Sequence, residues 1–137
     1  MRNLAIALAT ATALLAVPTA VAAKPKLTGE EQLAKIIGDR VPGEPVNCIS
    51  YFMTRNMEVI DKTALVYRNG GTIYVNRPRN AEHLDDDDVL VTKIHGSQFC
   101  SLDIVQTYER GGHFWNGFVS LGEFVPYRRA KTVAHAD

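Results

Sequence analysis

The spacing of apolar residues changes twice along the chain. Residues 4–17 form an almost unbroken apolar run, and residues 33–37 carry apolar side chains three and four positions apart. From residue 46 onward, apolar and polar positions tend to alternate. Spacings of three and four indicate one face of a helix, whereas a period of two indicates half-buried strands. The pattern therefore predicts a leading apolar segment, one short helix and a β-rich remainder.

The predicted helix has start and stop signals at both ends. Thr28 and Glu31 have the T-x-x-E spacing of a capping box, in which each side chain accepts a hydrogen bond from the other residue's backbone amide. Gly38 suits the left-handed conformation that often follows a helix. Residues 41–45 contain two prolines and a glycine, which break regular structure. We expect a helix that begins after Thr28 and ends before this turn.

The remaining elements are predicted to be strands. Asn69, Gly70 and Gly71 lie between two apolar segments, and both residue types tolerate the positive φ that hairpin turns require. This is the strongest local prediction, and Pro78 should end the second strand of the hairpin. The other predicted strands cover residues 46–53, 57–60, 63–68, 89–95, 99–106 and 117–125.

These elements predict one mainly β domain. We expect six or seven mostly antiparallel strands that curl into a small barrel or roll, with the short helix at its N-terminal side. In domain terms, residues 1–23 are a signal peptide, 24–44 a linker with the helix, 45–129 the β domain and 130–137 a flexible tail.

The first 23 residues have the three parts of a secretory signal peptide. Arg2 supplies a positive start, the apolar run follows, and residues 18–23 are mostly small. The run is shorter than the roughly 20 residues that span a bilayer, so we expect cleavage and no membrane span afterwards. Cleavage after Ala22 and cleavage after Ala23 both fit the small-residue rule. The predicted location is the periplasm or the extracellular medium.

Cys48 and Cys100 are the only cysteines, and an even count in an oxidising compartment favours a disulfide bond. A redox or metal pair is the alternative, but the C-x-x-C spacing is absent. On the predicted strands, Cys48 shares a face with Phe52, and Cys100 shares one with Leu102. We therefore expect both sulfur atoms to point into the core and to connect an early strand with a late one.

The balance of basic and acidic residues argues against two classes of partner, nucleic acids and membrane surfaces. The chain carries 15 basic and 15 acidic residues, which gives a formal net charge of zero. Nucleic-acid binding and binding to a membrane surface both call for a clustered basic excess. We expect neither.

Five short segments together resemble a known family. They are 45–49 (PVNCI), 74–79 (YVNRPR), 84–88 (LDDDD), 96–100 (GSQFC) and 117–127 (GFVSLGEFVPY). With them, residues 38–129 resemble a family of small secreted proteobacterial domains of the sphingomonad type, whose activity is not established. The resemblance implies a periplasmic or secreted domain with a cysteine pair, and it supplies no reaction, cofactor or catalytic residue.

The most conspicuous polar segment consists of four consecutive aspartates, and a histidine precedes it: Asp85, Asp86, Asp87, Asp88 and His83. Carboxylates can coordinate a hard cation such as Ca²⁺. However, EF-hand loops alternate their ligands, whereas consecutive aspartates in an extended segment point to opposite sides. We favour a segment that is solvated or paired with nearby arginines, and we keep these residues as weak metal candidates.

Arg77 and Arg79 lie two positions apart, so both guanidinium groups could bind one phosphate or carboxylate. The interpretation we favour is that they neutralise the aspartates of the same chain. Trp115 is the only tryptophan and lies in the segment 113–116 that follows Gly111 and Gly112, so it could stack on a sugar or a partner protein. The interpretation we favour is that Phe114 or Trp115 caps the open end of the barrel.

Catalytic residues are not assigned. Ser97 and His95 are close in sequence, and Asp103 could complete a triad, but the G-x-S-x-G motif is absent and residues 96–98 resemble a turn. The predicted function is therefore that of a non-enzymatic binding or structural protein of the cell envelope, without a cofactor and with an envelope protein as a possible partner. The alternative is a small metal-dependent or serine hydrolase.

Overall fold

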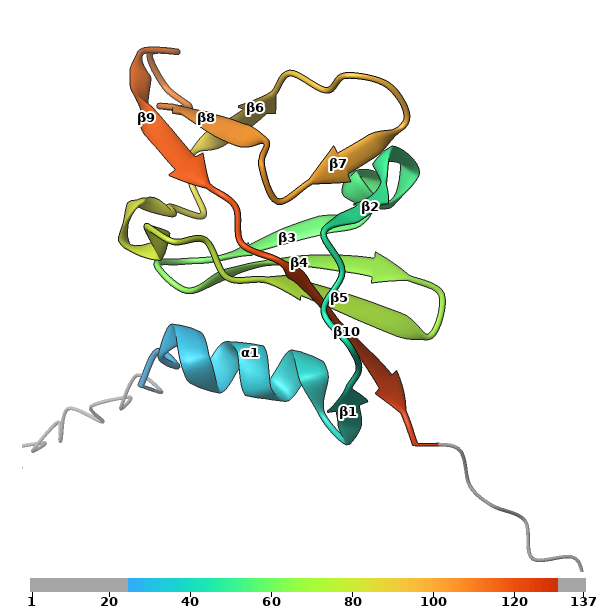
Figure 1. The fold of residues 1–137 in the computed structure, drawn as a ribbon. Coiled ribbons are helices and arrows are strands. Elements are labelled where there is room, and N and C mark those ends of the chain that lie inside the picture. The colour runs from blue at the N-terminus through green and yellow to red at the C-terminus, as the bar shows by residue number, and fades with distance from the viewer. Residues whose placement is uncertain (1–24, 131–137) are drawn as a thin grey trace, which may run out of the picture.

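The structure is a computed structural model that describes residues 25–130, in which a three-stranded and a two-stranded sheet lie on one side of a five-stranded sheet and one helix lies on the other (Figure 1). The predicted signal peptide and residues 131–137 of the predicted tail lie outside the described residues. The mainly β class is confirmed. Within residues 25–130, the helices are too short and too polar to cross a membrane.

Helix α1 (Gly29–Ile37) is capped as the sequence predicts. The Thr28 hydroxyl oxygen accepts a hydrogen bond from the Glu31 amide at 3.3 Å, and the Glu31 carboxylate accepts one from the Thr28 amide at 2.8 Å. The helix ends at Gly38, whose φ of 62° is a conformation that disfavours residues with a Cβ. Both ends of the helix are thus determined by local sequence.

The strands form sheets of five, three and two members. The five-stranded sheet contains, in spatial order, β1 (Arg40–Pro42), β10 (Phe124–Arg129), β5 (Thr72–Asn76), β4 (Ala64–Asn69) and β3 (Met57–Ile60). The three-stranded sheet contains β6 (Val89–Thr92), β8 (Ile104–Tyr108) and β9 (Trp115–Ser120). The two-stranded sheet contains β2 (Cys48–Ser50) and β7 (Gln98–Cys100). Two 3₁₀ helices, η1 (Tyr51–Asn56) and η2 (Ala81–His83), complete the elements.

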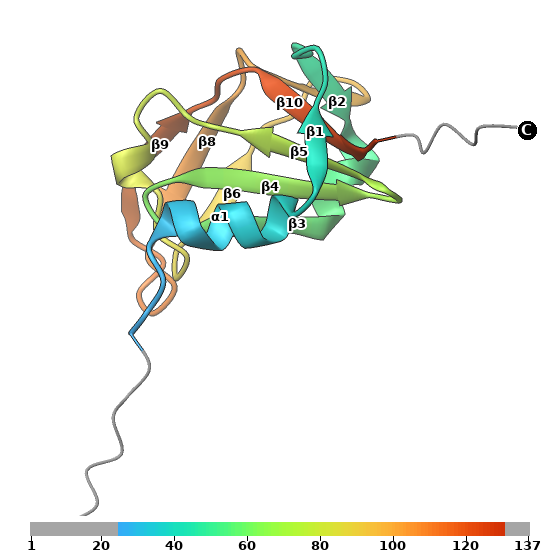
Figure 2. The ribbon, with the colours of Figure 1, turned by 90° about the horizontal axis from the view of Figure 1, so that it is seen from below.

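The five-stranded sheet separates two apolar cores. Strand β4 supplies both, because Val66 faces the helix and Leu65 and Tyr67 face the other two sheets. Helix α1 lies across the outer face of the sheet, where Leu33 is buried (Figure 2). The second core lies between the sheets and contains three aromatic rings in tilted or edge-on contact, those of Tyr67, Phe99 and Phe124. The first four residues of β4, Ala64 to Tyr67, are all buried and form the kind of continuous apolar run that burial on both faces requires.

The hairpin predicted at Asn69 is confirmed. Strands β4 and β5 pair antiparallel, with Asn69 opposite Thr72, and Gly70 and Gly71 form the two-residue connection. Gly70 has a φ of 56°.

The prediction of one curled sheet, a small barrel or roll, is only partly right: the strands are antiparallel, but they form three separate sheets and no closed barrel. Two predicted strands are each divided by a turn, residues 99–106 at positions 101–103 and residues 117–125 at positions 121–123. In the first turn, Asp103 accepts a hydrogen bond from the Cys100 amide at 2.7 Å and so stops the strand. The strand predicted at 46–53 ends at Ser50 and continues as η1, and β1 was not predicted.

Two asparagines hold the three-stranded sheet against the five-stranded one. The buried Asn76 side chain donates to the Gly122 carbonyl at 2.6 Å and accepts from the Gly122 amide at 3.1 Å. Asn80 donates to the Phe118 carbonyl at 2.9 Å and accepts from the Ser120 amide at 2.8 Å. Residues 77–79, between these asparagines, therefore run beside β9 and the turn that follows it without forming a regular strand.

The disulfide bond between Cys48 and Cys100 is present and joins β2 to β7. The two residues are opposite each other in the strand register, with Cα atoms 4.0 Å apart. The predicted orientation is wrong, because Ile49 and Phe99 fill the core side of this pair and the cysteines lie on the other, partly exposed side. In β2 and β7, the alternation of inward-facing and outward-facing side chains is shifted by one residue from the predicted one.

Candidate functional site

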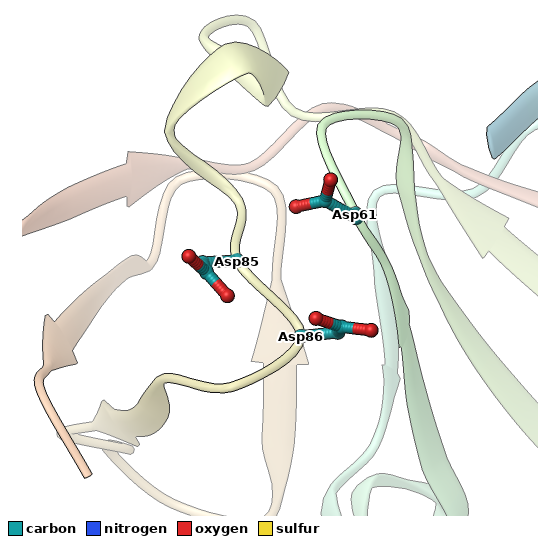
Figure 3. Close-up of side chains that lie close together, drawn as sticks. All are labelled: Asp61, Asp85 and Asp86. Atoms are coloured by element: carbon teal, nitrogen blue, oxygen red, sulfur yellow. The ribbon is translucent and has the colours of Figure 1, made fainter. Parts of the chain in front are cut away.

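Three aspartates converge where the β3–β4 turn meets the acidic loop of residues 84–88. One carboxylate oxygen from each of Asp61, Asp85 and Asp86 lies within 4.8 Å of the others (Figure 3). The close-up shows Asp61 on the turn and the two other aspartates on the loop. Asp61 was not among the predicted candidates, because it is more than twenty residues away in sequence and has no motif around it.

The backbone explains why the turn and the loop meet. The Lys62 amide donates to the Leu84 carbonyl at 3.0 Å, and the Leu84 side chain is buried in the core between the sheets. An oxygen cluster of this type could contribute ligands to a hard cation such as Ca²⁺. All three carboxylates are at least partly exposed, and such clusters also occur as solvated charge on protein surfaces. The cluster therefore does not define a metal site by itself.

The remaining metal candidates are held elsewhere. Asp87 pairs with Arg110 at 3.2 Å, and Asp88 accepts a hydrogen bond from the Asn116 side chain at 2.9 Å. His83 is exposed and has its Nε2 atom 3.8 Å from a carboxylate oxygen of its neighbour Glu82. The three-aspartate cluster thus contains two of the five predicted ligands, whereas Asp85, Asp87 and Asp88 line a separate polar hollow beside Trp115.

The two arginines near the acidic loop do not neutralise it. Both terminal nitrogens of Arg77 bind the Glu30 carboxylate of α1, at 2.6 and 2.8 Å. This hydrogen bonding lowers the pKa of Glu30 and raises that of Arg77. Arg79 instead lines a wide surface hollow of about 650 Å³ beside the disulfide bond. The predicted pairing with the loop is therefore wrong, and the acidic partner of Arg77 is one that the sequence did not suggest.

The residues of a possible serine hydrolase are separate. His95 and Asp103 line one shallow hollow on the surface, and Ser97 is not part of its wall. Within residues 25–130, no hydrogen bond joins the side chains of these three residues. The Ser97 carbonyl accepts from the Tyr51 amide at 3.0 Å, which positions the turn against η1. The structure therefore gives no support to nucleophilic activation of Ser97.

Trp115 lies on the outer face of the three-stranded sheet. It is the first residue of β9, is opposite Tyr108 in the register, and is 62% exposed. The expectation that it caps the end of a barrel is wrong. The register of β8 and β9 shifts after Thr107, so Asn116 has no partner on β8. Because of this bulge, Trp115 pairs with Tyr108 and points outward, whereas Gly117, the next paired residue, lies opposite Thr107.

The outer face carries exposed apolar side chains on all three strands, with the exposed Gln106 between those of β6 and β9. Val91, Gln106 and Phe118 form one row of the register, and Ile104 lies two positions from Gln106 on β8. Val91 is 46%, Ile104 54% and Phe118 48% exposed. The opposite face of the same strands packs into the core through Val105, Thr107 and Val119. We call Val91, Ile104, Trp115 and Phe118 the outer apolar face.

The sequence contains a signal for this surface that the prediction did not use. Around positions 104–105 and 118–119, apolar residues follow one another instead of alternating with polar ones. A sheet with one solvated face alternates apolar and polar side chains, so consecutive apolar residues indicate a second face that is also apolar.

Comparisons with known proteins give no relatives for this chain. No family model, no curated protein and no solved structure matches it. The resemblance to small secreted proteobacterial domains therefore stays a prediction.

Proposed function

We propose that the chain is a non-enzymatic binding domain that works outside the cytoplasm and holds a partner protein on the outer apolar face. The observation that carries the proposal is the exposure of Val91, Ile104, Trp115 and Phe118 on one side of an antiparallel sheet. An exposed apolar area of this kind marks an interaction site more often than a scattered apolar residue does.

The location rests on two features. The first 23 residues have the composition of a signal peptide. The disulfide bond between Cys48 and Cys100 persists in oxidising compartments and is rare in the cytosol. Together they support a periplasmic or secreted protein.

The chemistry of the face favours a protein over a sugar. Carbohydrate stacks on flat aromatic rings, whereas this face combines aromatic with aliphatic side chains, among them Val91 and Ile104. Leu102, which is almost fully exposed, extends the apolar area toward Lys93 and Asp103. A face that combines aromatic and aliphatic side chains with polar residues at its edge is compatible with a protein interface.

Site-specific photocrosslinking tests the proposal. A photoreactive phenylalanine analogue replaces Phe118 in one variant and Phe52, which is exposed on η1, in a matched control. We expect a defined crosslinked protein from position 118 that is absent from position 52 and is lost when Ile104→Glu is added. A crosslink to a second copy of the chain would show that the outer apolar face forms a homodimer instead of binding a different protein. Equal labelling at both positions, or none at 118, would refute the proposal.

A further inference from the structure

The polar hollow beside Trp115 carries an excess of negative charge. Its volume is about 310 Å³, and the exposed residues Trp115 and Phe114 form part of its wall. Four acidic residues and one basic residue also line it: Asp85, Asp87, Asp88, Glu109 and Arg110. We call this the acidic hollow. Because Trp115 belongs both to it and to the outer apolar face, the two surfaces are continuous.

The strand register explains why these residues meet at one end of the face. Strand β6 begins directly after the acidic loop, and Val89, Tyr108 and Trp115 form a row across the three strands. One position further, the Glu109 amide donates to the Phe114 carbonyl at 2.9 Å. The acidic loop and the β8–β9 connection therefore lie at the same end of the three-stranded sheet.

Part of the negative charge is not neutralised within the described chain. Asp87 pairs with Arg110, and Asp88 accepts a hydrogen bond from the Asn116 side chain. Within residues 25–130, no basic side chain forms a salt bridge with Asp85 or Glu109. The acidic hollow thus offers two carboxylates without a cationic partner next to exposed aromatic rings.

This arrangement suits an organic cation better than a metal ion. Among the described residues, Asp61, Asp85 and Asp86 form the only group of possible ligands close enough to share a metal ion, and only Asp85 of these lines the acidic hollow. A lysine or arginine side chain needs no converging ligands, because carboxylates attract it at longer range and the face of a tryptophan ring also binds cations. A benzene ring fits a cavity of roughly 150 Å³, so the acidic hollow has room for one such side chain.

The two ends of the outer apolar face differ in charge. At the end away from Trp115, the charged or titratable residues around the face are Lys93, His95 and Asp103. That end has no excess of acidic residues. A cationic group of a partner is therefore attracted to the Trp115 end, which gives the partner one preferred orientation.

We propose that the partner protein binds through a segment in which apolar side chains lie next to a lysine or an arginine. The apolar side chains contact the outer apolar face, and the cationic group enters the acidic hollow. This inference rests on the proposed function and adds to it the chemistry and the orientation of the partner.

Two double variants with the same change in net charge test the role of the acidic hollow. Asp85→Asn with Glu109→Gln neutralises the two free carboxylates, and asparagine keeps an acceptor oxygen for the Asp87 amide. Asp39→Asn with Glu44→Gln is the matched control, because both residues are exposed and neither lines the acidic hollow. Thermal denaturation followed by circular dichroism shows whether each variant is folded.

The protein that is crosslinked from position 118 is identified by mass spectrometry, purified and titrated against each variant. We expect the neutralised variant to bind it about two- to tenfold more weakly than the unmodified protein, and the control variant to bind it equally well. Added salt should weaken the binding of the unmodified protein more than that of the neutralised variant, because salt screens the attraction that the neutralised variant lacks.

A photoreactive analogue at Phe114, which is 72% exposed in the wall of the acidic hollow, identifies the partner segment bound there. We expect a lysine or arginine within about three residues of the labelled position, roughly 10 Å of extended chain. Changing that residue of the partner to glutamine should weaken binding to the unmodified protein and have little further effect on the neutralised variant.

The possible failures of the two proposals are distinguishable. A partner that is crosslinked from position 118 but binds the neutralised and unmodified proteins equally well would overturn this inference and leave the proposed function intact. A segment without lysine or arginine at position 114, or a second copy of the chain as the crosslinked species, would also overturn it. Absence of a crosslinked partner at both positions would overturn both proposals.

Discussion

The amide of Asn76 joins two sheets through a single glycine, and its removal should destabilise the domain strongly. Asn76→Ala deletes both hydrogen bonds to Gly122, at 2.6 and 3.1 Å, and leaves space where a fully buried side chain was. Two net hydrogen bonds contribute about 1 to 3 kcal/mol, and the lost packing adds about 1 kcal/mol. We expect a decrease of about 2 to 4 kcal/mol in the free energy of unfolding.

Urea denaturation followed by Trp115 fluorescence and far-UV circular dichroism measures this change. Asn80→Ala is a graded comparison, because Asn80 makes the same kind of bonds at a less buried position, where water can replace them. Asn56→Ala, at an exposed position, is the control and should change stability by less than about 0.5 kcal/mol. A loss below about 1 kcal/mol for Asn76→Ala would contradict the reasoning.

Asn76→Asp gives a second, pH-dependent test of the same contact. An ionised aspartate would place a carboxylate oxygen against the Gly122 carbonyl, so burial and repulsion should raise its pKa in the folded state. When the pKa is higher in the folded state, the variant keeps its full stability below the unfolded-state pKa, about 3.9. It loses stability as pH rises through the folded-state pKa. Relative to the unmodified protein, this variant should therefore lose stability between acidic and neutral pH. A constant difference across that range would contradict the assignment of the amide donor to the Gly122 carbonyl.

The remaining predictions concern the disulfide bond and the helix. Replacing Cys48 and Cys100 together by Ala should lower stability by about 2 to 5 kcal/mol in thermal denaturation, and reduction of the unmodified protein should have a similar effect. Thr28→Ala removes the helix cap and should cost about 1 kcal/mol by urea denaturation, whereas an unchanged midpoint would show that the cap is dispensable. The lowered pKa of Glu30 means that its pairing with Arg77 stabilises the fold above about pH 4.5 and is lost as pH falls through the folded pKa. The stability difference between the unmodified protein and Glu30→Gln should shrink over that range, and only modestly because the pair is exposed.

Local sequence determined the elements that were predicted well. The capping box at Thr28, the glycine that ends the helix and the hairpin at Asn69 each depend on a few adjacent residues. The disulfide bond was also predictable, because only one pairing of two cysteines exists. The orientation of that pair was not, since it depends on where Ile49 and Phe99 find their core.

The candidate sites depend on contacts that local patterns do not contain. Asp61 lies near Asp85 where a backbone hydrogen bond joins Lys62 to Leu84, a contact between segments far apart in sequence. The hollow lined by Tyr51, Thr54 and Leu90 brings η1 and β6 together, which no local pattern predicts. Alternation in sequence gives the faces of one strand, whereas sites between sheets depend on the packing of strands far apart in the chain.

The order of strands in the large sheet sets a constraint on when the domain can fold. Strand β10 lies inside that sheet, between β1 and β5, although it is the last strand of the chain. The early strands β3, β4 and β5 can pair locally, but β1 has nothing to pair with until residues 124–129 are available. Long-range closure of this kind is slow and comes late in folding. A chain with this topology stays incompletely folded while it is being synthesised or threaded through a translocation channel, and it closes its sheet only after its C-terminal strand has emerged.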